Sequence, residues 1–235
     1  LFSPTKTGVN NLCREGFSEH TLPPFNINNP KVYFCGDVMY DNSLYFAAQA
    51  KSQSSILSKS GIVKNDFMLC TIHRDSNTDN PKNLSEIFRA LIKISETQQQ
   101  NIVIPLHPRT AKVLEQNLSP ELFQQVNNST LLKIIEPVSF IDMISLESEC
   151  TMIITDSGGV QKESYFFQKP CIILRNETEW IELVEAGTAI IAGPDYAKIV
   201  DAYNQLASSK LSFAPLFGDG KASEFICSEM LSVLN

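Results

Sequence analysis

The chain has 235 residues, of which 43% are apolar and 19% charged, and its 19 basic and 26 acidic side chains give a net charge of −7. This composition is typical of a globular protein with one or two domains and a substantial core, and it argues against disorder. The negative charge excludes a nucleic-acid backbone as the main partner. No stretch approaches the roughly 18 apolar residues that a bilayer crossing needs, so we expect no membrane partner.

The six cysteines form no C-x-x-C pair, and most of them stand inside apolar runs. The sequence therefore predicts neither a metal site nor a redox motif, and it favours a reducing, cytoplasmic location. The chain begins on apolar residues at Leu1 without a signal-peptide pattern. We expect it to be part of a larger fold.

Short apolar runs alternate with helical patterns along the chain. The runs are nearly continuous in apolar and β-branched residues, which is typical of strands buried on both faces of a parallel sheet. Strands are predicted at residues 31–36, 67–73, 101–107, 131–136, 151–156, 171–175 and 188–192. Helices are predicted at residues 6–16, 83–97, 139–149, 158–168, 179–186, 196–208 and 222–234.

This alternation predicts an α/β fold, a Rossmann-like doubly wound parallel sheet with right-handed crossovers. Residues 1–35 form a separate strand–helix–strand piece, residues 36–217 form the main domain, and residues 218–235 form a closing helix. Asn83, followed by Glu86, resembles a capping box at the start of the helix at 83–97.

Ligands of such a sheet bind outside the carboxyl ends of its strands. After the strand at 151–156, Ser157, Gly158 and Gly159 form a tight turn into a helix, and the free amides and dipole of a helix N-terminus attract anions. Glu163 follows about one turn later and could accept hydrogen bonds from ribose hydroxyls. The alternative is an ordinary strand-to-helix turn with a serine cap.

Two histidines stand at the ends of other predicted strands. His73, with Arg74 beside it, precedes a polar loop and could donate to a phosphate or protonate a leaving oxygen. His107 stands in a rigid Pro-rich turn and could lie near a nucleotide. For both, a structural histidine bonded to a backbone carbonyl is the alternative.

The motifs T-I-H-R, L-H-P, T-D-S-G-G-V-Q-K-E, L-R-N-E-T-E-W and F-G-D-G-K-A occur in this order. With them, the whole chain resembles the C-terminal part of the non-hydrolysing UDP-N-acetylglucosamine 2-epimerases. Trp180 stands where the family carries an arginine. The E-T-E-W variant is also similar to relatives that act on UDP-2,3-diacetamido-2,3-dideoxyglucuronate.

The resemblance implies the C-terminal, UDP-binding half of a glycosyltransferase-B-like two-domain fold, preceded by a remnant of the N-terminal domain. It implies that Ser157, Gly158, Gly159 and Glu163 contact the diphosphate and ribose and that His73 is catalytic, while Arg74 and His107 are further candidates for UDP binding. The reaction would invert C2 of a UDP-sugar by elimination and re-addition of UDP, in a homodimer without metal or other cofactor.

The resemblance also places the carboxylates that exchange the C2 proton in the N-terminal domain. We therefore expect this chain to bind UDP weakly and not to epimerise a UDP-sugar alone. Two alternatives stay open, namely a glycosyltransferase of the same fold and a non-catalytic nucleotide-sugar-binding module.

Overall fold

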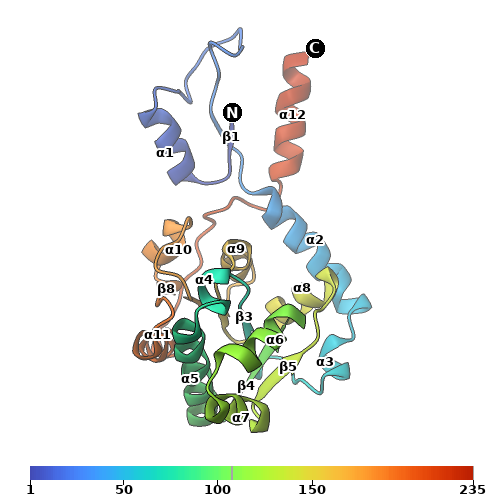
Figure 1. Ribbon diagram of the computed structural model, residues 1–235. Helices are drawn as coiled ribbons and strands as arrows, with labels where there is room; N and C mark the ends of the chain where they lie inside the picture. Colours follow the sequence, from blue (N-terminus) through green and yellow to red (C-terminus); the bar gives the residue numbers. More distant parts are fainter. Residues whose placement is uncertain (107, 235) are drawn as a thin grey trace. The chain divides into compact units, whose positions relative to one another are not determined.

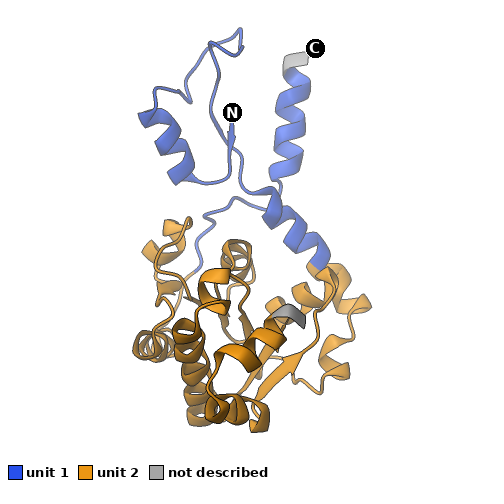
Figure 2. Cartoon of the chain, viewed as in Figure 1, with its two compact units in different colours: residues 1–46, 213–235 blue, residues 47–212 orange. Residues whose placement is uncertain are grey.

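The computed structural model describes residues 1–106 and 108–234, in which strands and helices alternate along the chain (Figure 1). Contacts divide the chain into two compact units, coloured separately in Figure 2. Unit 1 comprises residues 1–46 and 213–235, and unit 2 comprises residues 47–212. The predicted division at 1–35, 36–217 and 218–235 was placed from the order of strand and helix patterns, and it stays a prediction.

Unit 2 is built on a six-stranded, fully parallel sheet with strand order β5-β4-β3-β6-β7-β8. This is the doubly wound order in which the chain reverses its direction across the sheet between the two central strands. The strands are β3 (Phe67–Thr71), β4 (Asn101–Pro105), β5 (Leu132–Ile135), β6 (Ile153–Thr155), β7 (Cys171–Ile173) and β8 (Ala189–Ile191).

Helices cover both faces of this sheet because alternate residues of each strand point to opposite sides. Met68 and Cys70 of β3 belong to one apolar cluster, whereas Phe67 and Leu69 belong to the other. The first cluster is closed by α5 (Pro81–Gln98), α6 (Pro108–Asn117), α7 (Pro120–Asn128) and α11 (Tyr196–Ser208). The second is closed by α3 (Ile56–Lys59), α8 (Phe140–Glu149) and α9 (Gly158–Phe166). The remaining helices of this unit are α4 (Asp75–Thr78) and α10 (Ile181–Glu185).

Unit 1 brings together the two ends of the chain. Its parallel strands β1 (Phe2–Ser3) and β2 (Tyr33–Phe34) are connected through α1 (Lys6–Arg14). The long helix α2 (Val38–Gln53) begins in this unit, and α12 (Ala222–Leu234) ends it. The Asp41 carboxylate of α2 accepts hydrogen bonds from the backbone N–H groups of Ala222 and Ser223 at 3.1 and 2.7 Å. It therefore caps α12 and joins the two segments.

The predicted α/β fold with its parallel sheet is confirmed, and each predicted strand and helix has a counterpart. The predicted capping residue of α5 is wrong. Asn80, not Asn83, caps the helix by accepting from the amides of Lys82 and Asn83, with Pro81 as the first helical residue. Among the described helices, none combines the length and hydropathy that a bilayer crossing requires.

Candidate nucleotide site

The central strands β3 and β6 place two predicted motifs at the same edge of the sheet. They are hydrogen-bonded neighbours, with Thr71 opposite Thr155 in the register. The chain leaves β3 toward His73 and leaves β6 toward Ser157. Doubly wound sheets bind ligands in the crevice at this switch point, outside the carboxyl ends of the strands. The topology therefore puts the two motifs where a ligand is expected.

Asp156 connects these two strand ends and is fully buried. Its carboxylate accepts hydrogen bonds from the backbone N–H of His73 at 3.1 Å, the backbone N–H of Arg74 at 3.1 Å and the Nδ2 of Asn77 at 3.0 Å. The Nε of Arg74 donates in turn to the carbonyl oxygen of Asp156. Because a buried carboxylate needs such partners, these contacts fix the His73 segment against the start of α9.

Helix α9 begins at this edge with an anion-binding geometry. Ser157 is the N-cap, and its hydroxyl accepts from the amide of Val160 at 3.5 Å. The first helical bond runs from the amide of Gln161 to the carbonyl of Ser157, so the amides of Gly158 and Gly159 precede the helical ladder. Amides in that position, together with the helix dipole, stabilise a bound anion.

The fold does not require glycine at position 158. The backbone of Gly158 is not in the left-handed region, and an added Cβ would lie 3.4 Å or more from its neighbours, which is ordinary contact. A glycine that the fold does not require is expected where a ligand approaches the backbone closely. The indole Nε1 of Trp180 donates to the carbonyl of Gly158 at 2.9 Å, and the Lys162 ammonium lies 4.3 Å from the centre of the indole ring. Trp180 thus supports this turn through its hydrogen bond to the backbone.

A polar hollow of about 240 Å³ opens beside the site. Arg74, Asn77 and Arg175 are among its lining residues. Arg175 forms a two-pronged ion pair with Glu179 at 2.8 and 2.7 Å, and this pair lowers the pKa of the Glu179 carboxyl to about 2. Arg74 is solvent-exposed and is the predicted site residue in this hollow.

Glu163 lies further along α9, half-buried against α8. Its carboxyl shares a hydrogen bond with the carboxyl of Glu147, which is 1% exposed. Burial and the neighbouring Glu163 raise the pKa of Glu147 well above its usual range. Burial also raises the pKa of Glu163, while Lys162 and the hydrogen bond from Glu147 lower it in part. Burial and the repulsion between two neighbouring carboxylates therefore both favour a shared proton at this pair.

The predicted site residues mostly converge. His73, Arg74, Ser157, Gly158, Gly159 and Glu163 all belong to the segments that follow β3 and β6. His107 lies outside the described residues. Within the described chain, no group of three His, Cys, Asp or Glu side chains is arranged to hold a metal ion.

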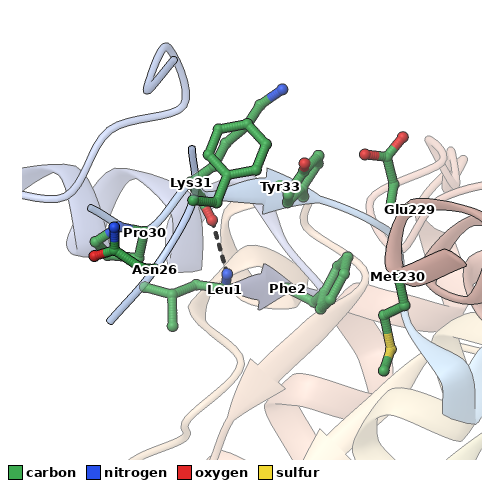
Figure 3. Close-up of a pocket in the computed structure, with 9 residues that line it drawn as sticks. Leu1, Phe2, Asn26, Pro30, Lys31, Tyr33, Glu229 and Met230 are labelled. Atoms are coloured by element: carbon green, nitrogen blue, oxygen red, sulfur yellow. Dashed lines mark hydrogen bonds between the residues drawn. The ribbon is translucent and has the colours of Figure 1, made fainter. Parts of the chain in front are cut away.

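A second, largely apolar hollow of about 370 Å³ lies in unit 1 and is lined by none of the predicted residues. Figure 3 shows Phe2, Tyr33 and Met230 around it, and the amino group of Leu1 donating to the carbonyl of Lys31 at 2.7 Å. Phe2 and Tyr33 stack with ring centres 5.3 Å apart. This hollow has no cluster of anion-binding groups comparable with the start of α9.

Sequence reasoning assigned no role to Asp156, Asn77 or Glu147. The first two could have been found as polar residues at and just beyond the ends of buried strands. Glu147 could not have been found in this way. An acidic residue on an amphipathic helix is expected to face solvent, and only the packing of α8 against α9 shows that Glu147 is buried.

Comparison with known proteins supports the fold and places the chain in a family. The family described as UDP-N-acetylglucosamine 2-epimerase matches residues 1–231. The chain is 39% identical over 224 residues to a UDP-N-acetylglucosamine 2-epimerase homolog of Methanococcus maripaludis, covering 95% of this chain and 58% of that protein. It is also 39% identical over 227 residues to the UDP-2,3-diacetamido-2,3-dideoxy-D-glucuronate 2-epimerase of Pseudomonas aeruginosa, covering 96% and 58% of the two chains.

Solved structures of UDP-GlcNAc 2-epimerases also superpose on this chain. The UDP-GlcNAc 2-epimerase of Methanocaldococcus jannaschii superposes with a TM-score of 0.84 at 32% identity, covering 99% of this chain and 62% of that one. The same enzyme in complex with UDP-GlcNAc and UDP gives a TM-score of 0.81 at 33% identity and covers 99% and 60%. The chain thus spans about three fifths of the length of these relatives. By its sequence and its fold, a Rossmann-like part of a glycosyltransferase-B-like architecture, the chain belongs to the UDP-N-acetylglucosamine 2-epimerase family.

Proposed function

We propose that this chain is the UDP-binding half of a UDP-N-acetylglucosamine 2-epimerase. The observation that carries the proposal is the turn at 157–159, where a helix N-terminus carries a glycine that the fold does not require. The turn is joined through Asp156 to the segment of His73. A diphosphate would accept hydrogen bonds from the amides of Gly158 and Gly159, and Glu163 would accept from the ribose hydroxyls.

The proposed reaction inverts C2 by eliminating UDP and adding it back to the opposite face. The departing diphosphate gains negative charge, so donors that are already oriented stabilise the transition state. The amides of the turn and the exposed His73 imidazole fit this role, and His73 is the proposed catalytic residue. Arg74 and His107 are proposed to assist UDP binding.

Removal and return of the C2 proton need a base and an acid. The family resemblance assigns those carboxylates to the N-terminal domain, of which residues 1–35 match only the last elements, and the chain spans about three fifths of the relatives. We therefore expect binding of UDP without turnover of UDP-N-acetylglucosamine. Proton NMR of the C2 signal checks this, and clear inversion by the chain alone would contradict it.

Calorimetric titration with UDP tests the site directly. Gly158→Ala keeps an allowed backbone and ordinary contacts, so we expect the fold to be retained while UDP affinity falls by about tenfold or more, equivalent to about 1.4 kcal/mol. Gly16→Ala is the control for the substitution itself, because it strains a backbone with a φ of +98° in unit 1 and should leave UDP affinity unchanged. Equal UDP affinity in the wild type and Gly158→Ala would refute the assignment of the turn.

A second UDP-sugar is a candidate substrate, since the Pseudomonas aeruginosa relative at 39% identity is named for a diacetamido-glucuronate substrate. Competition of both UDP-sugars for the UDP site distinguishes them. A glycosyltransferase would leave the C2 proton unexchanged in deuterated water, and a non-catalytic module would lose no activity on His73→Ala in the full-length protein. We further propose a homodimeric, cytoplasmic full-length enzyme that needs neither metal nor other cofactor, on the strength of the family resemblance.

A further inference from the structure

Helix α8 presents an acidic side chain to the nucleotide site that the proposed reaction does not use. Glu147 is 1% exposed, and its Oε2 has no hydrogen-bond partner among the described residues. A buried carboxylate without a donor is costly, and a second carboxylate beside it adds repulsion. Both costs are removed when one of the two acids is protonated and its O–H donates a hydrogen bond to a carboxylate oxygen of the other.

The surroundings decide which acid holds the proton. Glu163 is half-buried and lies beside the Lys162 ammonium, which favours its charged form. Glu147 faces Glu163 from α8, and the buried thiol of Cys150, on which the Lys169 charge also acts, donates to the backbone carbonyl of Glu147. On α3, packed against α8, Lys59 faces Asp142, whose pKa is lowered mainly by the hydrogen bond from Ser54 and in smaller part by the Lys59 charge. These surroundings favour the proton on Glu147, and burial raises the pKa of Glu147 well above its usual range.

We propose that Glu147 is a positioning residue of the nucleotide site, whose protonated carboxyl donates a hydrogen bond to Glu163 and holds the Glu163 carboxylate ready to accept from ribose hydroxyls. This inference rests on the proposed UDP site. Glu147 touches no substrate in this scheme and acts through Glu163.

Three variants separate positioning from simple packing. Glu147→Gln keeps a donor toward Glu163 without a titrating proton. Glu147→Met keeps the approximate length but removes the donor. Glu149→Gln, two residues further along α8 and paired with Lys64 at 2.8 Å, is the matched control.

The first readout is calorimetric binding of UDP and of 2′,3′-dideoxy-UDP between pH 6 and 9. We expect Glu147→Met to weaken UDP binding by about tenfold at neutral pH, the effect of losing one hydrogen bond to a charged group. The loss should shrink as pH rises, because Glu163 without its donor ionises at higher pH. The dideoxy nucleotide should bind all proteins alike, and Glu147→Gln should bind UDP as the wild type does. An equal loss for both nucleotides in Glu147→Met would show a packing defect and overturn the proposal.

The second readout needs no nucleotide. Carbon-13 NMR titration of the glutamate side-chain carboxyls, assigned with Glu147→Gln and Glu163→Gln, should show Glu147 ionising well above an ordinary glutamate. Ordinary ionisation of Glu147 with intact UDP binding would overturn the positioning role alone. Raised ionisation with no UDP binding by the wild type would contradict the proposed UDP site, and the positioning role with it.

Discussion

At the scale of single residues, Asp156 determines how the candidate site is assembled. Its two carboxylate oxygens receive donors from His73, Arg74 and Asn77, which all follow β3, while Asp156 itself ends β6. The His73 backbone is therefore held by an acceptor on the neighbouring strand. A change at this buried residue should affect stability as well as ligand binding.

Asp156→Asn replaces one acceptor oxygen with an NH₂ group that faces backbone donors. We expect the free energy of unfolding to fall by about 1–3 kcal/mol for each donor left unpaired. Urea denaturation measures the loss. Asp201→Asn, on the exposed face of α11, is the matched control and should stay within about 0.5 kcal/mol of the wild type. If the two variants lose the same stability, the Asp156 contacts do not stabilise the site.

At the scale of elements, two chain segments of unit 1 cross at glycines. Gly218 has a φ of +87°, and a Cβ added there would lie 2.9 Å from the Cα of Gly36. The amide of Asp37 donates to the carbonyl of Phe217 at 2.9 Å, directly beside this crossing. Contact this close is open only to residues without a side chain.

Gly218→Ala should therefore destabilise the protein by more than Gly16→Ala. Gly16 has a similar φ of +98° but nothing within 4 Å of an added Cβ, so its substitution costs only the backbone strain of about 1–2 kcal/mol. Gly218→Ala adds the clash with Gly36. Thermal unfolding of both variants measures the difference, and equal losses would mean that the crossing relaxes without cost.

The sequence predicts elements well where periodicity and burial coincide. Runs such as 67–73 and 101–107 are apolar enough to be recognised as buried strands, and β3 and β4 lie within them. Helices α2, α6 and α7 were not predicted. The polar stretch after Arg74 was expected as a loop but forms α4, which buries Asn77 and Thr78. Such a turn is stabilised by tertiary hydrogen bonds rather than by local propensity.

The candidate site was also predictable only where local patterns indicate it. Motifs at strand ends indicated His73 and Ser157–Gly159 because ligands of parallel sheets bind there. Strand order decides whether two such ends meet, and the adjacency of β3 and β6 is a long-range property. Contacts between side chains of separate helices, such as Glu147 with Glu163, likewise depend on packing that no local pattern encodes.

At the scale of the whole molecule, the buried acids make stability depend on pH. A carboxyl whose pKa is raised by folding binds its proton more tightly in the native state, so stability falls as pH rises from the unfolded value toward the folded one. The pKa values of Glu147 and Glu163 are both raised. Above about pH 4.5, wild-type stability should therefore fall relative to Glu147→Gln, by at most about 1.4 kcal/mol per pH unit for each proton.

Urea denaturation of both proteins at pH 5, 6, 7 and 8 measures this difference. Parallel curves for the wild type and Glu147→Gln would show that Glu147 titrates normally. Glu149→Gln is the control on the same helix and should keep the pH dependence of the wild type, because Glu149 is paired with Lys64 and not with a second acid.

Unit 1 is drawn from residues 1–46 and 213–235, whereas unit 2 is one continuous stretch of chain. During translation, the segment that carries Gly218 and the helix capped by Asp41 leaves the ribosome after all of unit 2. Unit 2 has all its strands before then and can fold as a domain on the growing chain. Residues 1–46 must therefore wait for residues 213–235 before unit 1 can form, so this earlier segment would gain most from protection by chaperones against proteases and aggregation.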